Sequence, residues 1–179
     1  MKPDSQTFRS AMGRFASGVT VVTVRANDGS DHGMTASAFS SVSMEPPLLL
    51  VCIKNENQTL QLLTEEGSSF HNKFAVNILA RSQEVLSNRF AGGYIDENGA
   101  WQRWPEGKDK FADVECTRGE ESQAVVFPQA LASFDCSVEH LYDGGDHKIV
   151  VGRIHNISLS EAEPEVLLYF SGKYGDFRR

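Results

Sequence analysis

Hydrophobic and polar residues alternate along much of this chain with the period of two that is typical of β-strands. The clearest alternation covers residues 131–141 and 148–159, which the turn sequence Asp143-Gly144-Gly145-Asp146 joins into a predicted hairpin. Further strands are predicted from runs rich in Val, Ile, Leu and Thr, at residues 19–25, 34–44, 48–53, 74–79 and 167–170. The pattern therefore predicts a mainly β chain with an antiparallel sheet, closed as a small barrel.

Three segments have the apolar spacing of short helices. Residues 5–18 place apolar side chains on one face, and we expect that face to cover a sheet; these side chains are Phe8, Ala11, Met12 and Phe15. A second helix is predicted at residues 58–66 with Asn57 as its N-cap, and a third at residues 83–90 with Ser82 as its N-cap.

Composition favours one compact domain. The 179 residues are 40% hydrophobic and 23% charged, which suits a single core and predicts one domain over residues 1–179. Residues 93–123 are polar and have little periodicity, so we expect a surface excursion from that domain.

The charge balance narrows the possible partners. Seventeen Lys and Arg against 24 Asp and Glu give a formal charge of −7, which repels a nucleic-acid backbone. No apolar run approaches membrane-spanning length and the first residues lack the pattern of a signal peptide, so we expect a cytoplasmic protein with no membrane contact.

The cysteines and histidines do not indicate a metal site. Cys52, Cys116 and Cys136 are odd in number and far apart, with no C-x-x-C spacing. The five histidines are scattered, without the spacing of metal ligands. We therefore expect reduced thiols, no disulfide framework and no bound metal.

Hydroxyl side chains recur through residues 33–44. On a continuous strand, Thr35, Ser37, Phe39, Ser41 and Ser43 would share one face. Such a row suits the carbonyl and ring-nitrogen edge of a flavin, or the oxygens of a ribityl phosphate. A solvated strand face explains the same composition.

Two other segments carry polar groups where a ligand could bind. Residues 54–59 place a lysine, amides and a hydroxyl at a predicted helix start, which suits a phosphate but also a simple capped helix. His147 follows a two-glycine turn, where it could contact a nicotinamide nucleotide or belong to an ordinary hairpin. Aromatic residues at 169–175 could cover a ring or pack the strand end. No G-x-G-x-x-G or P-loop motif is present.

The order of several motifs is more specific than any one of them. They are Phe8-Arg9-Ser10-Ala11-Met12-Gly13-Arg14-Phe15-Ala16-Ser17-Gly18-Val19-Thr20-Val21-Val22-Thr23, Gly33-Met34-Thr35-Ala36-Ser37-Ala38-Phe39, Ser41-Val42-Ser43, Pro46-Pro47-Leu48, Phe74-Ala75-Val76-Asn77-Ile78-Leu79, Arg89-Phe90-Ala91-Gly92, Gly145-Asp146-His147-Lys148-Ile149-Val150-Val151-Gly152 and Tyr169-Phe170. In this order they resemble the short-chain flavin reductase family, the reductase components of two-component flavin-dependent monooxygenases. The resemblance covers nearly the whole chain.

This resemblance implies a fold, an activity and partners. The fold would be mainly β with a few helices, an antiparallel Greek-key split β-barrel that binds FMN in related proteins. The activity would be reduction of FAD or FMN by NADH or NADPH, with release of the reduced flavin to a partner monooxygenase. Members of the family are usually homodimers.

The resemblance also implies site residues. Flavin contacts would come from Thr35, Ala36, Ser37, Ala38, Phe39, Ser41, Cys52, Ile53, Lys54, Asn55, Gln58 and Thr59. Arg89, Phe90 and Ala91 would help to close the pocket, while Gly145, Asp146, His147 and Tyr174 would contact the nicotinamide nucleotide, with His147 as the catalytic residue. The chain departs from the family pattern mainly in residues 93–123.

Two alternatives remain at this point. A non-catalytic flavin carrier would use the same barrel, with the turn before His147 purely structural. A split-barrel oxidase resembling pyridoxamine phosphate oxidase would need a basic pocket, and few Arg or Lys residues lie near the proposed one.

Overall fold

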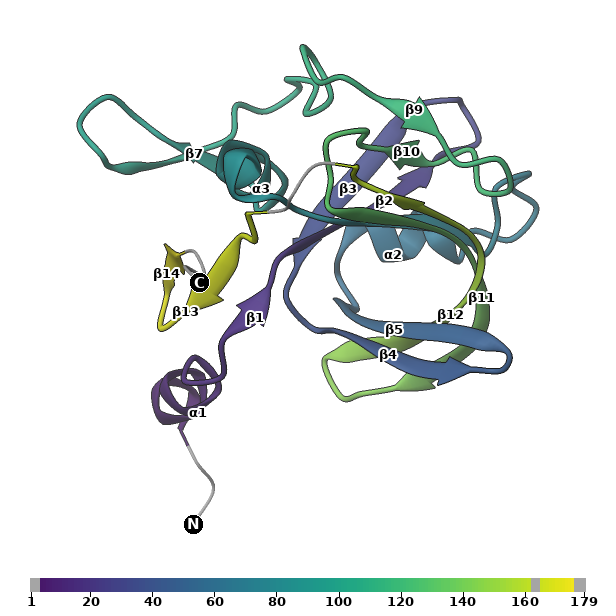
Figure 1. Cartoon of the computed structure of the whole chain (residues 1–179), viewed down its shortest axis with the longest axis horizontal. Helices are drawn as coiled ribbons and strands as arrows, with labels where there is room; N and C mark the ends of the chain where they lie inside the picture. Colours follow the sequence, from purple (N-terminus) through teal and green to yellow (C-terminus); the bar gives the residue numbers. More distant parts are fainter. Residues whose placement is uncertain (1–3, 162–164, 176–179) are drawn as a thin grey trace.

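The computed structural model describes residues 4–161 and 165–175 (Figure 1). The helices are α1 (Ser5–Met12), α2 (Gln58–Leu63), the 3₁₀ turn η1 (Arg81–Gln83) and α3 (Glu84–Phe90). The strands are β1 (Ser17–Gly18), β2 (Thr20–Arg25), β3 (Asp31–Ala36), β4 (Phe39–Met44), β5 (Pro47–Lys54), β6 (Lys73–Ile78), β7 (Gly93–Ile95), β8 (Trp101–Arg103), β9 (Thr117–Arg118), β10 (Val125–Val126), β11 (Ala132–Asp143), β12 (His147–Leu159), β13 (Leu168–Phe170) and β14 (Lys173–Gly175). The prediction of a mainly β chain with few helices is confirmed.

Seven strands form the main sheet, in the order β3-β2-β6-β11-β12-β5-β4, with every neighbouring pair antiparallel. The edge strands β3 and β4 are consecutive in the chain, and only Ser37 and Ala38 separate them. This link spans at most about 11 Å, so the sheet must curl until its edges approach each other. The amide of Cys52 on β5 donates to the Ala38 carbonyl (3.0 Å) at this seam. Among the described residues no strand pairing joins the two edges, so the predicted closed barrel is not observed.

The long hairpin β11–β12 confirms the strongest pattern in the sequence. Its register pairs Ala132 with Leu159 and Asp143 with Lys148, with irregularities after Asp135 and Val138. β11 also pairs with β6, and β12 with β5, so this hairpin forms the centre of the sheet. Both strands curve strongly (Figure 1).

The sheet packs apolar side chains on both faces. On the inner face, β2, β5 and β6 bury a cluster with α2 that includes Leu60, Leu63 and Cys136. On the outer face, Val19 and Val21 pack with Phe90 of α3 and with Phe127. The predicted strand at residues 48–53 lies within β5, where Leu49, Val51 and Ile53 are buried and the residues between them are half-buried.

The predicted helix starts were only partly right. Asn57 caps α2 as predicted, accepting a hydrogen bond from the Thr59 amide (2.9 Å), but the helix ends at Leu63. Ser82 is not a cap, because the 3₁₀ turn η1 begins one residue before it and α3 follows at Glu84. The Gln83 side chain accepts from the Ala80 amide (2.9 Å) instead.

The first helix does not cover the sheet, contrary to the prediction. Asp4 is its N-cap, and α1 stops at Met12. None of its residues is buried; Phe8 and Met12 are 58% and 57% exposed, and Phe15, which follows the helix, is 78% exposed. Figure 1 shows α1 beside β1 and away from the curved sheet. The apolar face that the sequence pattern identified is therefore open.

Residues 93–123 form the hairpin β7–β8 and then fold back over the outer face of the sheet. Phe111 and Val114 pack against the outer cluster. The Arg89 guanidinium donates to the carbonyls of Lys110 (3.3 Å) and Ala112 (2.9 Å), and its carbon lies 4.9 Å from the Trp104 ring centre. This excursion is therefore anchored to α3 by a guanidinium that also stacks on an indole.

Candidate functional site

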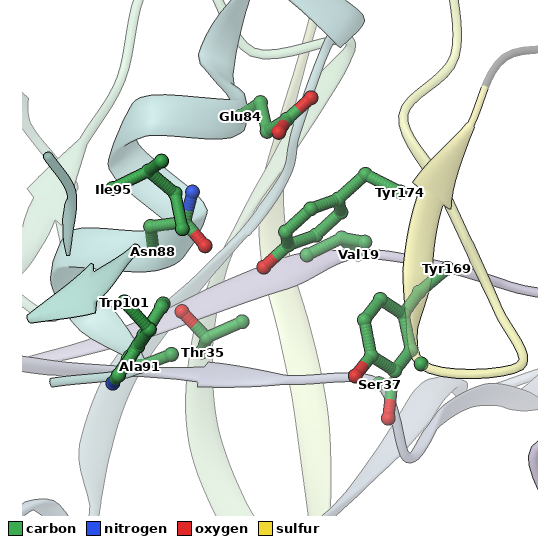
Figure 2. A pocket seen from close by; sticks show the side chains of 11 residues that line it. Val19, Thr35, Ser37, Glu84, Asn88, Ala91, Ile95, Trp101, Tyr169 and Tyr174 are labelled. Carbon is green, nitrogen blue, oxygen red and sulfur yellow. The ribbon is translucent and has the colours of Figure 1, made fainter. Parts of the chain in front are cut away.

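A cavity of about 370 Å³ lies between α3, β3, the β7–β8 hairpin and the β13–β14 hairpin (Figure 2). In this view Asn88, Ala91, Ile95 and Trp101 lie on one side and Tyr169 and Tyr174 on the other. The complete lining is Val19, Thr35, Ser37, Glu84, Asn88, Ala91, Ile95, Trp101, Tyr169, Gly172 and Tyr174. The volume is near the lower end for small-molecule sites, so it suits one ring system of a ligand rather than a whole dinucleotide.

Ser87 fixes two walls of this cavity. It is fully buried in α3, its carbonyl accepts a hydrogen bond from Thr35 Oγ1 (2.7 Å), and its hydroxyl bonds to the Tyr174 hydroxyl (2.8 Å). One residue of α3 thus links β3 to β14. Burial raises the pKa of the Tyr174 phenol above its ordinary value, although the bond to Ser87 acts in the opposite direction.

The β7–β8 hairpin forms an apolar wall. Ile95 is the cross-strand partner of Trp101, so both side chains share one face of the hairpin. The Trp101 ring lies so close to Gly93 that a Cβ there would stand 2.4 Å from a ring carbon. On the other face Tyr94 packs edge-on against Trp104, which is held by Arg89. The hairpin therefore presents Trp101 to the cavity from an anchored position.

Four of the predicted cofactor residues line this cavity, namely Thr35, Ser37, Ala91 and Tyr174. The predicted continuous row of hydroxyls is wrong, because β3 ends at Ala36 and β4 begins at Phe39. A register shift between Ser41 and Ser43 breaks the alternation again. Phe39 packs against the inner core and Ser41 is exposed, so neither continues the wall begun by Thr35.

A second predicted group lines a neighbouring cavity of about 480 Å³. Gln58, Thr59 and Phe90 lie there, and Ala91 borders both cavities. The excursion contributes Lys108 and Lys110 to the opposite wall. Burial lowers the pKa of the Lys110 ammonium. This cavity is more polar than the first and carries charges of both signs, since Asp31 and Asp109 also line it.

A third predicted group meets at the tip of the long hairpin. Asn55 donates from its side chain to the Gly145 carbonyl (3.0 Å) and from its backbone amide to the Asp146 carbonyl (3.0 Å). Lys54 is paired in register with His147. The imidazole of His147 contacts the Asp146 carboxylate (2.7 Å), and this contact holds the pKa of Asp146 below its usual range. The structure thus joins two segments that lie 90 residues apart in the sequence.

The other predicted residues have different positions. Ala36 and Ile53 point into the protein interior, so their side chains are unavailable to a ligand. Cys52 is half-buried, and burial raises the pKa of its thiol. Ala38 lies at the seam between β3 and β4, where its carbonyl is bonded to Cys52. Arg89 uses its guanidinium to hold the excursion.

Asn88 and Ile95 were not predicted as site residues, and Trp101 was expected only as part of the surface excursion. Asn88 is 6% exposed, lines the first cavity, and has no side-chain hydrogen bond to any described residue. In the sequence it is one polar residue within a helix, so only the packing around α3 distinguishes it. A hint existed for Trp101 and Ile95, since apolar side chains in an otherwise polar stretch require a partner surface.

Comparison with known proteins decides the family. The model of the flavin reductase like domain matches residues 12–178. The chain belongs to this family. The NADH-dependent FAD reductase of Streptomyces globisporus is 37% identical to it over 176 residues, which are 98% of this chain and 86% of the relative. The reductase component of 4-hydroxyphenylacetate 3-monooxygenase from Thermus thermophilus is 36% identical over 169 residues, 94% of each chain.

Other flavin reductases extend the comparison. A probable flavin reductase of Rhizobium meliloti is 36% identical over 84% of this chain, which spans only 42% of that relative's length. A solved structure of the Streptomyces globisporus C-1027 NADH:FAD oxidoreductase, in complex with NAD and FAD fragments, superposes with a TM-score of 0.81 at 34% identity. The match covers 98% of this chain and 93% of that one.

Within residues 4–161 and 165–175, no group of three or more His, Cys, Asp or Glu side chains could hold a metal ion. No described helix is both long and apolar enough to cross a bilayer.

Proposed function

We propose that this flavin reductase transfers hydride from NADH to FAD, and that the isoalloxazine ring binds in the cavity between α3 and the β13–β14 hairpin. The observation that carries the assignment of the ring is a cavity that combines aromatic and aliphatic walls with a few polar side chains, Thr35, Ser37 and Asn88. Apolar walls bury a planar ring, and a few fixed polar groups orient it. The choice of NADH and FAD rests on the named activities of the relatives.

The donors and acceptors of this cavity fit a flavin. The Thr35 hydroxyl donates to Ser87, so its oxygen is left to accept a hydrogen bond from a hydroxyl of the ribityl chain. The Ser37 hydroxyl has no side-chain partner among the described residues and can donate to a ring carbonyl. Tyr169 and Tyr174 pack edge to face, with ring centres 5.2 Å apart, and form the aromatic wall.

Hydride passing from the nicotinamide C4 to the flavin N5 is the chemistry that the two bound nucleotides supply. The chain needs no nucleophile, because its task is to hold two rings in contact with the reacting atoms aligned. Ser87 contributes by fixing Thr35 and Tyr174, and the β7–β8 hairpin limits the access of water. We place His147, with Asp146 and Gly145, on the nicotinamide nucleotide, because Asn55 holds this turn rigidly beside Lys54.

The same proposal covers a partner, a location and an assembly. The reduced flavin would pass to a monooxygenase, as the name of the Thermus thermophilus relative indicates for that protein. We place the chain in the cytoplasm as a single domain over residues 1–179. A second copy of the chain would cover α1, because Phe8, Met12 and Phe15 form an open apolar face.

We also propose that the sheet has the Greek-key split-barrel arrangement of flavin-binding proteins. Its support is the short link between β3 and β4, which holds opposite edges of the sheet together. The cavity proposed for the flavin lies next to this seam, since Thr35 and Ser37 flank the end of β3.

Anaerobic mixing of the purified protein with FAD and NADH tests this function. The visible absorbance of the flavin should bleach at a rate proportional to the concentration of protein. Flavin that binds without bleaching would identify a carrier and contradict the proposal. NADPH and FMN, tested in parallel, give the specificity ratios for both substrates. Protein denatured by heat provides the control for direct reduction of flavin by NADH.

A further inference from the structure

Asn88 carries an amide that the protein itself leaves unpaired. Its side chain is 6% exposed and lines the proposed flavin cavity (Figure 2). No described residue forms a hydrogen bond with this amide. The amide atoms still have accessible surface, since among described residues only Arg89 Nε is both covered and unpaired. The Asn88 amide is therefore accessible from the cavity and has no hydrogen-bond partner among the described residues.

A second buried asparagine shows what a structural amide looks like in this chain. Asn77 is fully buried in β6, where its Nδ2 donates to the carbonyls of Val21 (3.3 Å) and Val125 (3.2 Å). Its Oδ1 accepts from the Phe127 amide (3.0 Å) and from Ser133 Oγ (2.8 Å). Asn77 thus uses both ends of its amide within the protein, whereas Asn88 uses neither.

An almost buried amide that has no hydrogen-bond partner in the protein lowers stability relative to an amide that is paired. An apolar side chain at this place in α3 would pack against Ala91 and Ile95 without that cost. The polar residue is therefore better explained by a ligand that supplies the missing partners. The ligand must offer an acceptor and a donor side by side, because Nδ2 donates and Oδ1 accepts.

We propose that Asn88 recognises the pyrimidine edge of the isoalloxazine ring, with Nδ2 donating to the C4 carbonyl and Oδ1 accepting from N3–H. This inference rests on the proposed function and adds a residue that determines flavin binding. The pair of hydrogen bonds fixes the rotation of the ring in its plane. Thr35 and Tyr174, which Ser87 holds on the neighbouring walls, then limit its tilt.

Binding and stability of Asn88→Ala, measured together, test the proposal. Equilibrium dialysis should give a Kd for riboflavin and for FMN about tenfold higher than in the wild type, because two neutral hydrogen bonds are lost. The Kd for NAD⁺ should not change. The melting temperature should stay the same or rise, because the variant removes an unpaired amide from the protein. Asn77→Ala is the matched control, and it should lower the melting temperature.

A modified ligand makes the test specific to the N3 position. The wild type should bind 3-methylriboflavin several-fold more weakly than riboflavin, and Asn88→Ala should bind the two ligands about equally. Unchanged riboflavin affinity in Asn88→Ala would overturn the proposal while leaving the reductase activity in place. A loss of NAD⁺ affinity instead would assign Asn88 to the nicotinamide carboxamide and overturn it as well. A wild-type protein that neither binds riboflavin nor reduces flavin would contradict the proposed function itself.

Discussion

The hydroxyl groups of Ser87 and Tyr174 lie 2.8 Å apart and join α3 to the β13–β14 hairpin. Ser87 is fully buried, so Tyr174→Phe would leave its hydroxyl without a partner. We expect a loss of about 1 kcal/mol, seen as a fall of about 2–4 °C in melting temperature. Adding Ser87→Ala to Tyr174→Phe should cost less than Ser87→Ala does in the wild type. Additive effects would show that the hydrogen bond contributes nothing.

Replacing His147 should affect the nicotinamide nucleotide selectively. We expect His147→Ala to raise the KM for NADH about three- to tenfold, since one polar contact is lost, while the Kd for FAD changes little. Stopped-flow kinetics with each substrate varied separately would measure both. His155→Ala is the control, because that imidazole bonds to Ser137 rather than to the turn before His147. Lost flavin binding with intact nicotinamide affinity would reject this role.

The buried thiol of Cys136 should make the free energy of unfolding depend on pH. Its thiol is fully buried beside Asp135, and burial raises its pKa far above the usual value. In the unfolded chain a thiol ionises near pH 8.5, so this group favours folding below that pH and progressively less above it. The slope contributed by one group is at most about 1.4 kcal/mol per pH unit.

The measurement is denaturant unfolding of the wild type and Cys136→Ala across pH 8 to about 10, the range in which an unfolded thiol ionises. At pH 8 the variant should have a lower free energy of unfolding than the wild type, because a buried side chain is shortened. That free energy should then fall less steeply as the pH rises. Cys52 and Cys116, whose pKa values are also raised, remain in both proteins and contribute equally. Parallel curves would contradict the assignment.

The open face of α1 predicts dimerisation. Light scattering coupled to size-exclusion chromatography should give twice the mass of the chain for the wild type. Phe15 follows α1 and is 78% exposed, so Phe15→Asp places a charge beside Phe8 and Met12 and should shift the population towards the monomer. Val85→Asp, which introduces the same charge at an exposed apolar residue of α3, should leave the dimer population unchanged. The opposite pattern would move the interface away from α1.

The sequence was most informative where the structure is local. The hairpin β11–β12 could be predicted because long alternating strands and a two-glycine turn act over neighbouring residues. The break at Ser37 and Ala38 could not, because every residue there is compatible with an extended strand and the break depends on where the sheet edges meet. The position of α1 failed for a related reason, since an amphipathic pattern shows that a face needs covering but not what covers it.

Some residues of the candidate site could be predicted from the sequence, and others could not. Thr35, Ser37 and Ala91 were found because family motifs contain them, and the structure brings them to one cavity. Tyr174 lines the same cavity, although the resemblance assigned it to the nicotinamide nucleotide. Gln58 and Thr59 line a different cavity, although the resemblance assigned them to the same flavin site. Asn88 carries no local signal and Trp101 only a weak one, since their exposure to the cavity depends on the packing of α3 and of the β7–β8 hairpin.

A crystal of the protein soaked with FMN would locate the bound flavin ring. We expect the isoalloxazine ring between α3 and the β13–β14 hairpin, in contact with Thr35, Ser37 and Tyr174. A ring found instead in the cavity beside Lys108 and Lys110, or a cavity filled by the protein's own side chains in the presence of bound flavin elsewhere, would contradict it.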